Sequence, residues 1–265
     1  MILNAPPSSI FSRRARLFLS LIPLFLALPL NTAYADAREV FSSKSPTWLR
    51  AVGKLHVPGV KFESGHQLNH REDCSATLVG NTAPETTGAG GVNRPAADTI
   101  ITAWHCLEFY RDISKTITFT LLYGTQDSFS VAAYRLADGG GMNADWAVLR
   151  LVDPVPAKLV SALSVHPAKA DKHRSIIMAG YSKNSEGERL SYDPHCSITD
   201  LSPALKGTSE SNCNALKGAS GGAVVQFSTG GEPLLAGVVS QGNGQGLSLF
   251  VPVAEFRSAI RASLK

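Results

Sequence analysis

The sequence predicts an antiparallel all-β protein. Many short apolar runs are separated by clusters of glycine, proline, asparagine and aspartate, which is the pattern of strands joined by turns. Strands do not alternate with long helical runs, so a doubly wound parallel sheet is not expected. A chain of 265 residues can hold one large all-β domain or two small ones.

Residues 1–35 have the composition of a secretory signal peptide. Three arginines within residues 13–16 precede a leucine-rich stretch at 17–30, and residues 33–35 offer small side chains at the cleavage positions. The apolar stretch is short for a bilayer span and contains two prolines, which disfavours a retained anchor. We therefore predict a secreted or periplasmic protein that begins near Asp36.

The first half contains six predicted strands. Apolar and β-branched residues fill these runs, and turn residues bound them. The runs are residues 51–57, 75–79, 99–102, 116–122, 129–136 and 146–151. Residues 81–98 lack apolar periodicity and are predicted to form a surface loop.

Four further predicted strands follow a proline-rich stretch at 153–172, which we interpret as a linker between two groups of strands. These strands are residues 175–180, 223–227, 234–240 and 247–251. The period then changes, because Val253, Phe256, Ile260 and Leu264 lie at spacings of three, four and four. This spacing predicts a terminal helix with one apolar face, packed on the second half.

Charge and cysteine content limit the possible partners. Residues 1–35 hold three of the 25 Lys and Arg and none of the 21 Asp and Glu, so the remainder carries roughly one net positive charge. Neither nucleic acid nor a membrane is expected as a partner of the mature protein. An even number of cysteines in an exported chain predicts two disulfides, with three possible connectivities, among Cys74, Cys106, Cys196 and Cys213.

The spacing of two histidines before the first cysteine could also indicate a zinc site. His66, His70 and Cys74 are spaced by four residues, but the segment 63–73, ESGHQLNHRED, is mostly polar and predicts a solvated loop. We therefore expect no metal and no cofactor.

Ser220 lies at the centre of a glycine-rich turn, in the segment KGASGGAVV at 217–225. The turn also satisfies the G-x-S-x-G pattern of the α/β-hydrolases, in which an acid and then a histidine follow the serine. The last histidine here is His195, so no histidine follows Ser220, and the only acidic residues after it are glutamates. Chain order therefore excludes that class.

Two residues upstream complete a catalytic pattern. His105 ends the apolar stretch IITAWHC at 100–106, and Asp145 precedes another predicted strand in NADWAVLRL at 143–151. A serine hydroxyl is a weak nucleophile until a neighbouring base takes its proton. The order His–Asp–Ser therefore indicates nucleophilic catalysis.

These segments resemble the chymotrypsin/trypsin-like serine endopeptidases of the bacterial secreted type. The resemblance runs from about residue 52 to the terminal helix and rests on CSATLVG, TAWHC, DWAVLRL, GASGGAV and GVVSQG, in the order of that family. It implies two perpendicular, antiparallel six-stranded β-barrels with the active site between them. Residues 36–152 would form the barrel with His and Asp, 153–172 the linker, and 173–265 the barrel with Ser plus the terminal helix.

The resemblance also implies roles for individual residues. Ser220 would be the nucleophile, His105 the general base and Asp145 the residue that orients the imidazole. The backbone N–H groups of Gly218 and Ser220 would bind the developing oxyanion. The implied activity is the hydrolysis of peptide bonds in proteins or peptides, through an acyl-enzyme, by a monomer. The alternative is a catalytically inactive protease-like binding module.

Other implied features concern substrate binding and the disulfides. Asn214 would be the uncharged floor of the primary specificity pocket, Ser240 would support Asp145, and Gly242 would leave the pocket entrance open. The implied disulfide beside the histidine joins Cys74 to Cys106, which leaves Cys196 to pair with Cys213.

Ala219 departs from the family pattern. In the digestive-type members an aspartate at this position forms a salt bridge with a new N-terminus freed by proteolysis. Alanine offers no charge for a buried ammonium group. Arg50 and Ala51 resemble such a cleavage junction, but we prefer to interpret 51–57 as the first strand and predict activity without that cut.

Overall fold

The computed structural model describes residues 38–80, 85–86, 92–93, 95–184, 187–202 and 205–264. The predicted signal peptide and much of the predicted loop 81–98 lie outside the described residues. Within the described part, no helix is long and apolar enough to cross a membrane.

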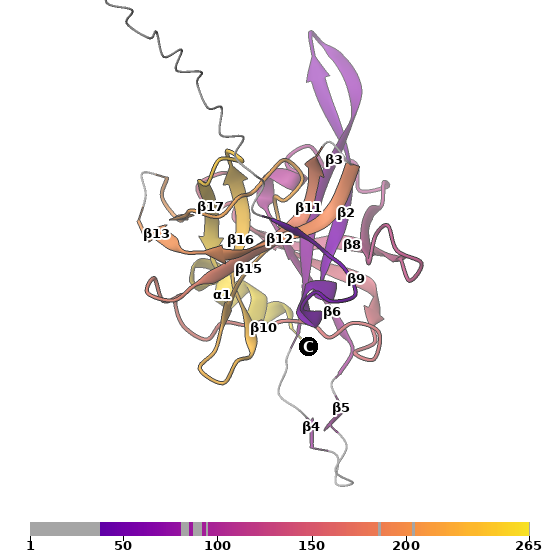
Figure 1. Ribbon diagram of the computed structural model, residues 1–265. Helices are drawn as coiled ribbons and strands as arrows, with labels where there is room; N and C mark the ends of the chain where they lie inside the picture. The colour runs from indigo at the N-terminus through magenta and orange to yellow at the C-terminus, as the bar shows by residue number, and fades with distance from the viewer. Residues whose placement is uncertain are drawn as a thin grey trace, which may run out of the picture. The chain divides into compact units, whose positions relative to one another are not determined.

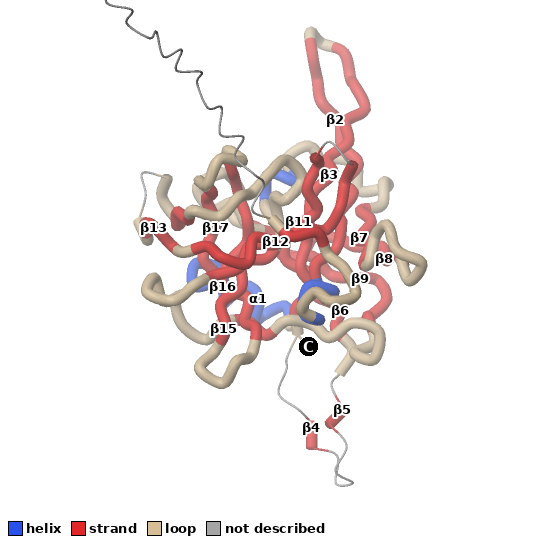
Figure 2. Tube along the Cα trace, viewed as in Figure 1, coloured by secondary structure: helices blue, strands red, loops and turns tan. Residues whose placement is uncertain are grey.

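The described residues form a mostly β structure with one α-helix near the C-terminus, which confirms the predicted fold class (Figure 2). The first part is a closed, six-stranded barrel in the order β2-β3-β6-β9-β8-β7. Its strands are β2 (Val52–Glu63), β3 (His66–Val79), β6 (Ala97–Thr102), β7 (Ile117–Leu121), β8 (Phe129–Asp138) and β9 (Ala147–Val155).

Alternating burial shows why these sequences close into a barrel. In β7, Ile117, Phe119 and Leu121 are buried, while Thr118 and Thr120 are partly exposed. Side chains on a strand point alternately to its two faces, so this pattern fills the barrel interior with the apolar set. Closure also leaves none of the six strands as an unpaired edge of this barrel.

The prediction of a polar loop at 63–73 is wrong. β2 and β3 continue as a paired hairpin to Glu63 and His66, and its outer part projects from the barrel (Figure 1). Ser64 and Gly65 have φ of 51° and 81°, the positive values of a two-residue hairpin turn. Residues 66–69 are exposed. This part of the hairpin therefore contacts water and packs against no core, which accounts for its polar sequence.

The second part is a sheet that does not close on itself among the described residues. Its order is β1-β12-β11-β15-β16-β17-β14-β13, with β10 parallel to β16. The fold is therefore one closed barrel plus a half-barrel sheet, where the resemblance implied two six-stranded barrels. The strands are β1 (Glu39–Val40), β10 (Ser164–Val165), β11 (Ile176–Asn184), β12 (Gly187–Cys196), β13 (Ile198–Asp200), β14 (Ser209–Ser211), β15 (Ala223–Phe227), β16 (Pro233–Gly242) and β17 (Ser248–Pro252).

Several short elements were not predicted. A short strand pair, β4 (Glu85–Thr86) with β5 (Val92–Asn93), lies inside the predicted loop. The predicted linker 153–172 is partly strand, since β9 extends to Val155 and β10 lies at Ser164–Val165. Two 3₁₀ helices, η1 (Thr47–Ala51) and η2 (Trp104–Leu107), precede and follow barrel strands.

The terminal helix α1 (Val253–Ser263) contacts both parts of the fold, not only the second. Val253, Phe256 and Ile260 are buried, as the spacing predicts. The ring of Phe256 stacks on Trp146, which precedes β9, at 5.2 Å between centroids. The carbonyl of Ser263 accepts hydrogen bonds from barrel side chains, so α1 ties the sheet to the barrel.

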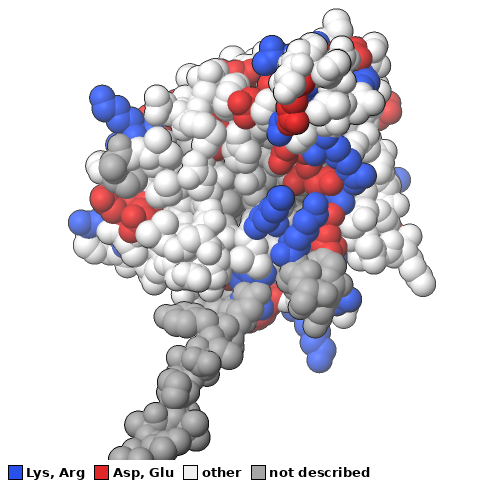
Figure 3. All heavy atoms as spheres, turned by 90° about the horizontal axis from the view of Figure 1, so that it is seen from above, with Lys and Arg blue, Asp and Glu red and all other residues white. Residues whose placement is uncertain are grey.

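A buried ion pair joins the barrel to the second sheet. Lys54 of β2 is 6% exposed, and its ammonium group bonds to the carboxylate of Glu188 on β12. The ammonium group also lies 4.4 Å from the ring centroid of Tyr123. A buried charge is tolerated when it is paired in this way. On the face viewed in Figure 3, acidic and basic side chains are interspersed, and basic ones do not form a separate broad patch.

Candidate active site

His105 and Asp145 meet where two neighbouring barrel strands begin and end. β6 pairs with β9 through Thr102 and Ala147, so the residue three places after Thr102 lies close to the residue two places before Ala147. Asp145 is fully buried. Its Oδ2 lies 2.8 Å from His105 Nδ1, and its Oδ1 accepts the His105 backbone N–H at 2.9 Å.

These contacts fix the tautomer of His105. A carboxylate accepts hydrogen bonds, so Nδ1 carries the proton and Nε2 is free to accept one. Burial lowers the pKa of His105, but the hydrogen bond and charge of Asp145 raise it more, so the net pKa is raised. The histidine is therefore a stronger base than an isolated imidazole.

Ser240 is the third donor to Asp145. Its hydroxyl donates to Oδ2 at 2.5 Å and is buried. Burial raises the pKa of Asp145, but the hydrogen bonds from His105 and Ser240 lower it below its ordinary value. The carboxylate is thus held ionised beside the imidazole.

Ser220 lines a cavity of about 440 Å³ together with His105, Ser240, Gln241 and Gly242. Its hydroxyl donates to the carbonyl of Ser240 at 3.2 Å. Among the described residues no hydrogen bond joins this hydroxyl to His105. Catalytic hydrogen bonds are often long or misaligned without substrate, so sharing one cavity is the relevant observation.

The turn before Ser220 leaves two backbone donors available. The N–H groups of Gly218 and Ser220 make no hydrogen bond with any described group, while Ala219 N–H donates to Leu216 at 2.9 Å. Gly218 has φ of +95°, which strongly favours glycine. A Cβ on Gly221 would lie 2.1 Å from the carbonyl oxygen of Ser75, so no larger residue fits there.

The predicted substrate-binding residues lie near this turn. Asn214 accepts the Gly246 N–H at 2.7 Å through its side chain. The backbone N–H of Asn214 donates at 2.9 Å to Asp193, a buried carboxylate that is not among the residues predicted from the sequence. In β12 the apolar residues Leu190 and Tyr192 are two positions apart, which predicts that their side chains share one buried face. This spacing does not predict that Asp193, on the other face, is buried as well.

Gly242 lies in close contact with Ala215, and its role at the pocket entrance stays a prediction. A Cβ placed on it would lie 2.4 Å from the carbonyl oxygen of Ala215 and 2.7 Å from its methyl carbon. The two segments that line this side of the cavity are therefore in close contact.

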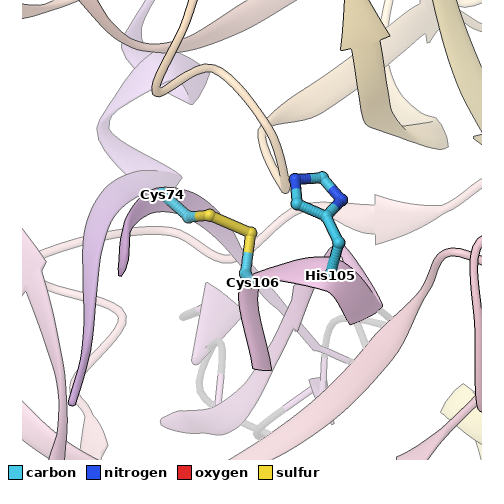
Figure 4. Close-up of side chains that lie close together, drawn as sticks. All are labelled: Cys74, His105 and Cys106. Atoms are coloured by element: carbon cyan, nitrogen blue, oxygen red, sulfur yellow. A yellow bond between two sulfur atoms is a disulfide. The ribbon is translucent and has the colours of Figure 1, made fainter. Parts of the chain in front are cut away.

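All four cysteines lie in the described part of the chain and form disulfides. One joins Cys74 to Cys106 and the other joins Cys196 to Cys213. Figure 4 shows the first beside the His105 imidazole. The ligand atoms of Cys74, His105 and Cys106 lie within 4.8 Å of one another. Disulfide sulfurs are not thiolates, however, so this group is not a thiolate metal site.

A sequence model of the trypsin-like peptidase domain matches residues 74–232. No curated protein sequence matches the chain. A serine endoprotease from Yersinia pestis has a similar fold, with 15% identity and a TM-score of 0.52, over 82% of this chain and 63% of that one.

Two further structures are similar. The HtrA-type protease AlgW with a decapeptide has 15% identity and a TM-score of 0.53, over 82% of this chain and 65% of its own. The thermostable serine protease AL20 from an extremophilic microorganism has 17% identity and a TM-score of 0.56, over 82% of this chain and 98% of its own. The match thus spans under two thirds of the first two proteins and nearly all of AL20.

Proposed function

The chain belongs to the trypsin-like peptidase family, and from this membership we propose that it is a serine endopeptidase with Ser220, His105 and Asp145 as its catalytic groups. One observation carries the proposal. A buried, ionised Asp145 holds His105 in the tautomer that accepts a proton, and His105 shares a cavity with Ser220.

The proposed reaction begins when Ser220 Oγ attacks the carbonyl carbon of a peptide bond. The hydroxyl proton passes to His105 Nε2, and Asp145 stabilises the imidazolium that forms. The negative charge on the former carbonyl oxygen is stabilised by the N–H groups of Gly218 and Ser220. His105 then donates the proton to the leaving amine, and water, activated by His105, releases the acyl group.

This proposal is tested by assaying the purified chain from Asp36 onward on an unstructured protein such as casein. We expect new peptide N-termini, detected by mass spectrometry, and none from Ser220→Ala prepared in parallel. Equal cleavage by both preparations would point to a contaminating protease. No cleavage by either would favour the inactive binding module.

We further propose that the protein works outside the cytoplasm. The leader-like residues 1–35 support export, and so do two disulfides, which persist in oxidising compartments.

We expect the enzyme to prefer a small, uncharged residue before the scissile bond. Gly242 lies against Ala215, so little width remains between the two segments that line the cavity, and the Asn214 side chain carries no charge to pair with lysine or arginine. Cleavage of a peptide library, read by mass spectrometry, should show enrichment of alanine, glycine or serine. Strong selection for arginine, lysine or large aromatic residues would contradict this.

The chain beginning near Asp36 should be active without cleavage at Arg50. Ala51 and Val52 are fully buried, and Val52 pairs with Thr77 inside the barrel. A protease cannot reach this bond without opening the barrel, and a freed N-terminus would find no carboxylate at Ala219. Arg50→Gln should therefore leave activity within about twofold, with the intact N-terminus verified by mass spectrometry. An inert Arg50→Gln that gains activity only as a chain starting at Ala51 would contradict the account.

A further inference from the structure

The oxyanion turn, residues 217–220, is held without a charged group at Ala219. Ala219 is 3% exposed and belongs to an apolar cluster that includes Met178 and Val224. The turn must still keep the N–H groups of Gly218 and Ser220 in place, because catalysis depends on donors positioned before the reaction.

Ser75 contacts both sides of this turn. Its backbone N–H donates to the carbonyl of Ser220 at 2.8 Å, and its hydroxyl donates to the carbonyl of Gly218 at 2.9 Å. Those two carbonyls lie on either side of the peptide unit that carries the Ser220 N–H, and each belongs to a residue whose own N–H is proposed to bind the oxyanion. One residue thus fixes the turn at two points.

Ser75 is itself held from two other elements. Its hydroxyl accepts the N–H of Tyr181, on β11 of the second sheet, at 2.8 Å. Its carbonyl accepts the hydroxyl of Thr102, on β6 of the barrel, at 2.8 Å. Ser75 lies on β3 and is fully buried, so water does not compete for these bonds.

A hydroxyl suits this position because it accepts one hydrogen bond and donates another through a single atom. It joins the N–H of Tyr181 to the carbonyl of Gly218, and so joins the second sheet to the turn. Alanine would leave both backbone groups buried without their partner. The space is also tight, since a Cβ on Gly180 would lie 3.0 Å from the Ser75 hydroxyl oxygen.

We propose that Ser75 is a positioning residue that holds the oxyanion turn in its catalytic form, as an uncharged clamp between the barrel and the second sheet. This inference rests on the proposed serine peptidase function. It means that folding alone, with no later cut, organises the turn.

The test compares Ser75→Ala with Thr77→Val. Thr77 lies two residues further along β3, is equally buried, and its hydroxyl has no partner among the described groups, which makes it a matched control. Kinetics are expressed per folded molecule, with the folded fraction measured by near-UV circular dichroism.

For Ser75→Ala we expect kcat to fall by about 10- to 100-fold with KM nearly unchanged, because the defect concerns the transition state. Affinity for a peptide aldehyde, which forms a tetrahedral adduct with Ser220, should fall by the same factor as kcat/KM. Thr77→Val should keep both values. A folded Ser75→Ala with the kcat and aldehyde affinity of the native enzyme overturns the proposal.

If Ser75→Ala does not fold, Thr102→Val decides. It removes the hydroxyl that holds the Ser75 carbonyl, so a smaller fall in kcat, again with KM unchanged, supports the clamp. An unchanged kcat overturns it. Failure of the proposed function is distinguished by the native enzyme, which would then neither cleave peptides nor bind the aldehyde.

Discussion

Replacing Ser220 with alanine should reduce kcat by about 10⁶-fold, and replacing His105 with alanine should cost nearly as much. The double replacement should be hardly worse than either single one. In the proposed mechanism His105 contributes by accepting the Ser220 proton, so its replacement should add little further loss once Ser220 is absent.

The measurement is a double-mutant cycle on kcat, using one peptide substrate and the four purified proteins. Ser130→Ala and His173→Ala are matched controls, because both residues are exposed, and these variants should stay within about twofold of the native rate. Independent losses that multiply in the double variant would show that Ser220 and His105 do not act as one unit. The residual activity of the variants would come from binding and the oxyanion donors.

Replacing Asp145 with asparagine should reduce kcat by about 10⁴-fold near neutral pH. Asparagine can donate a hydrogen bond to Nδ1, which favours the tautomer with the proton on Nε2, where it cannot accept the Ser220 proton. The substitution would also remove the negative charge that stabilises the imidazolium. Asp153→Asn, at an exposed position on β9, is the control and should keep the native rate.

The pH profile gives this prediction a second readout. The Asp145 carboxylate raises the pKa of His105, and in the proposed mechanism His105 can accept the Ser220 proton only when it is unprotonated. In the native enzyme, the acidic limb of kcat/KM should therefore lie above the ordinary imidazole pKa of about 6.5. In Asp145→Asn it should move to lower pH. A limb that does not move would mean that another group controls the profile.

Much of the fold could be predicted because most of its strands contain apolar residues that form the buried core. The barrel strands are rich in β-branched and apolar residues, which are buried alternately in β7 and consecutively in β6 and β9. The strands that were missed lack this signal. The outer hairpin at 63–73 is solvated, and β12 contains Pro194 and buries polar residues such as Asp193 alongside its apolar ones.

The candidate site could be predicted in part, from residue order and glycine spacing. Those features indicated His105, Asp145 and Ser220. In the structure His105 is hydrogen-bonded to the Asp145 carboxylate and lines one cavity with Ser220. They could not indicate Ser75, because a serine in a strand has no sequence pattern that reveals its partners in distant segments. The same limit applies to Gly242, whose contact with Ala215 depends on how two segments pack.

The central claim is that Ser220 is an activated nucleophile, and a fluorophosphonate probe tests it most directly. The chain from Asp36 onward is incubated with the probe, digested, and mapped by tandem mass spectrometry. We predict a single adduct on Ser220, much slower labelling in His105→Ala, and none in Ser220→Ala. A native, folded protein that leaves Ser220 unlabelled, or one that carries the adduct on another serine, would contradict the claim.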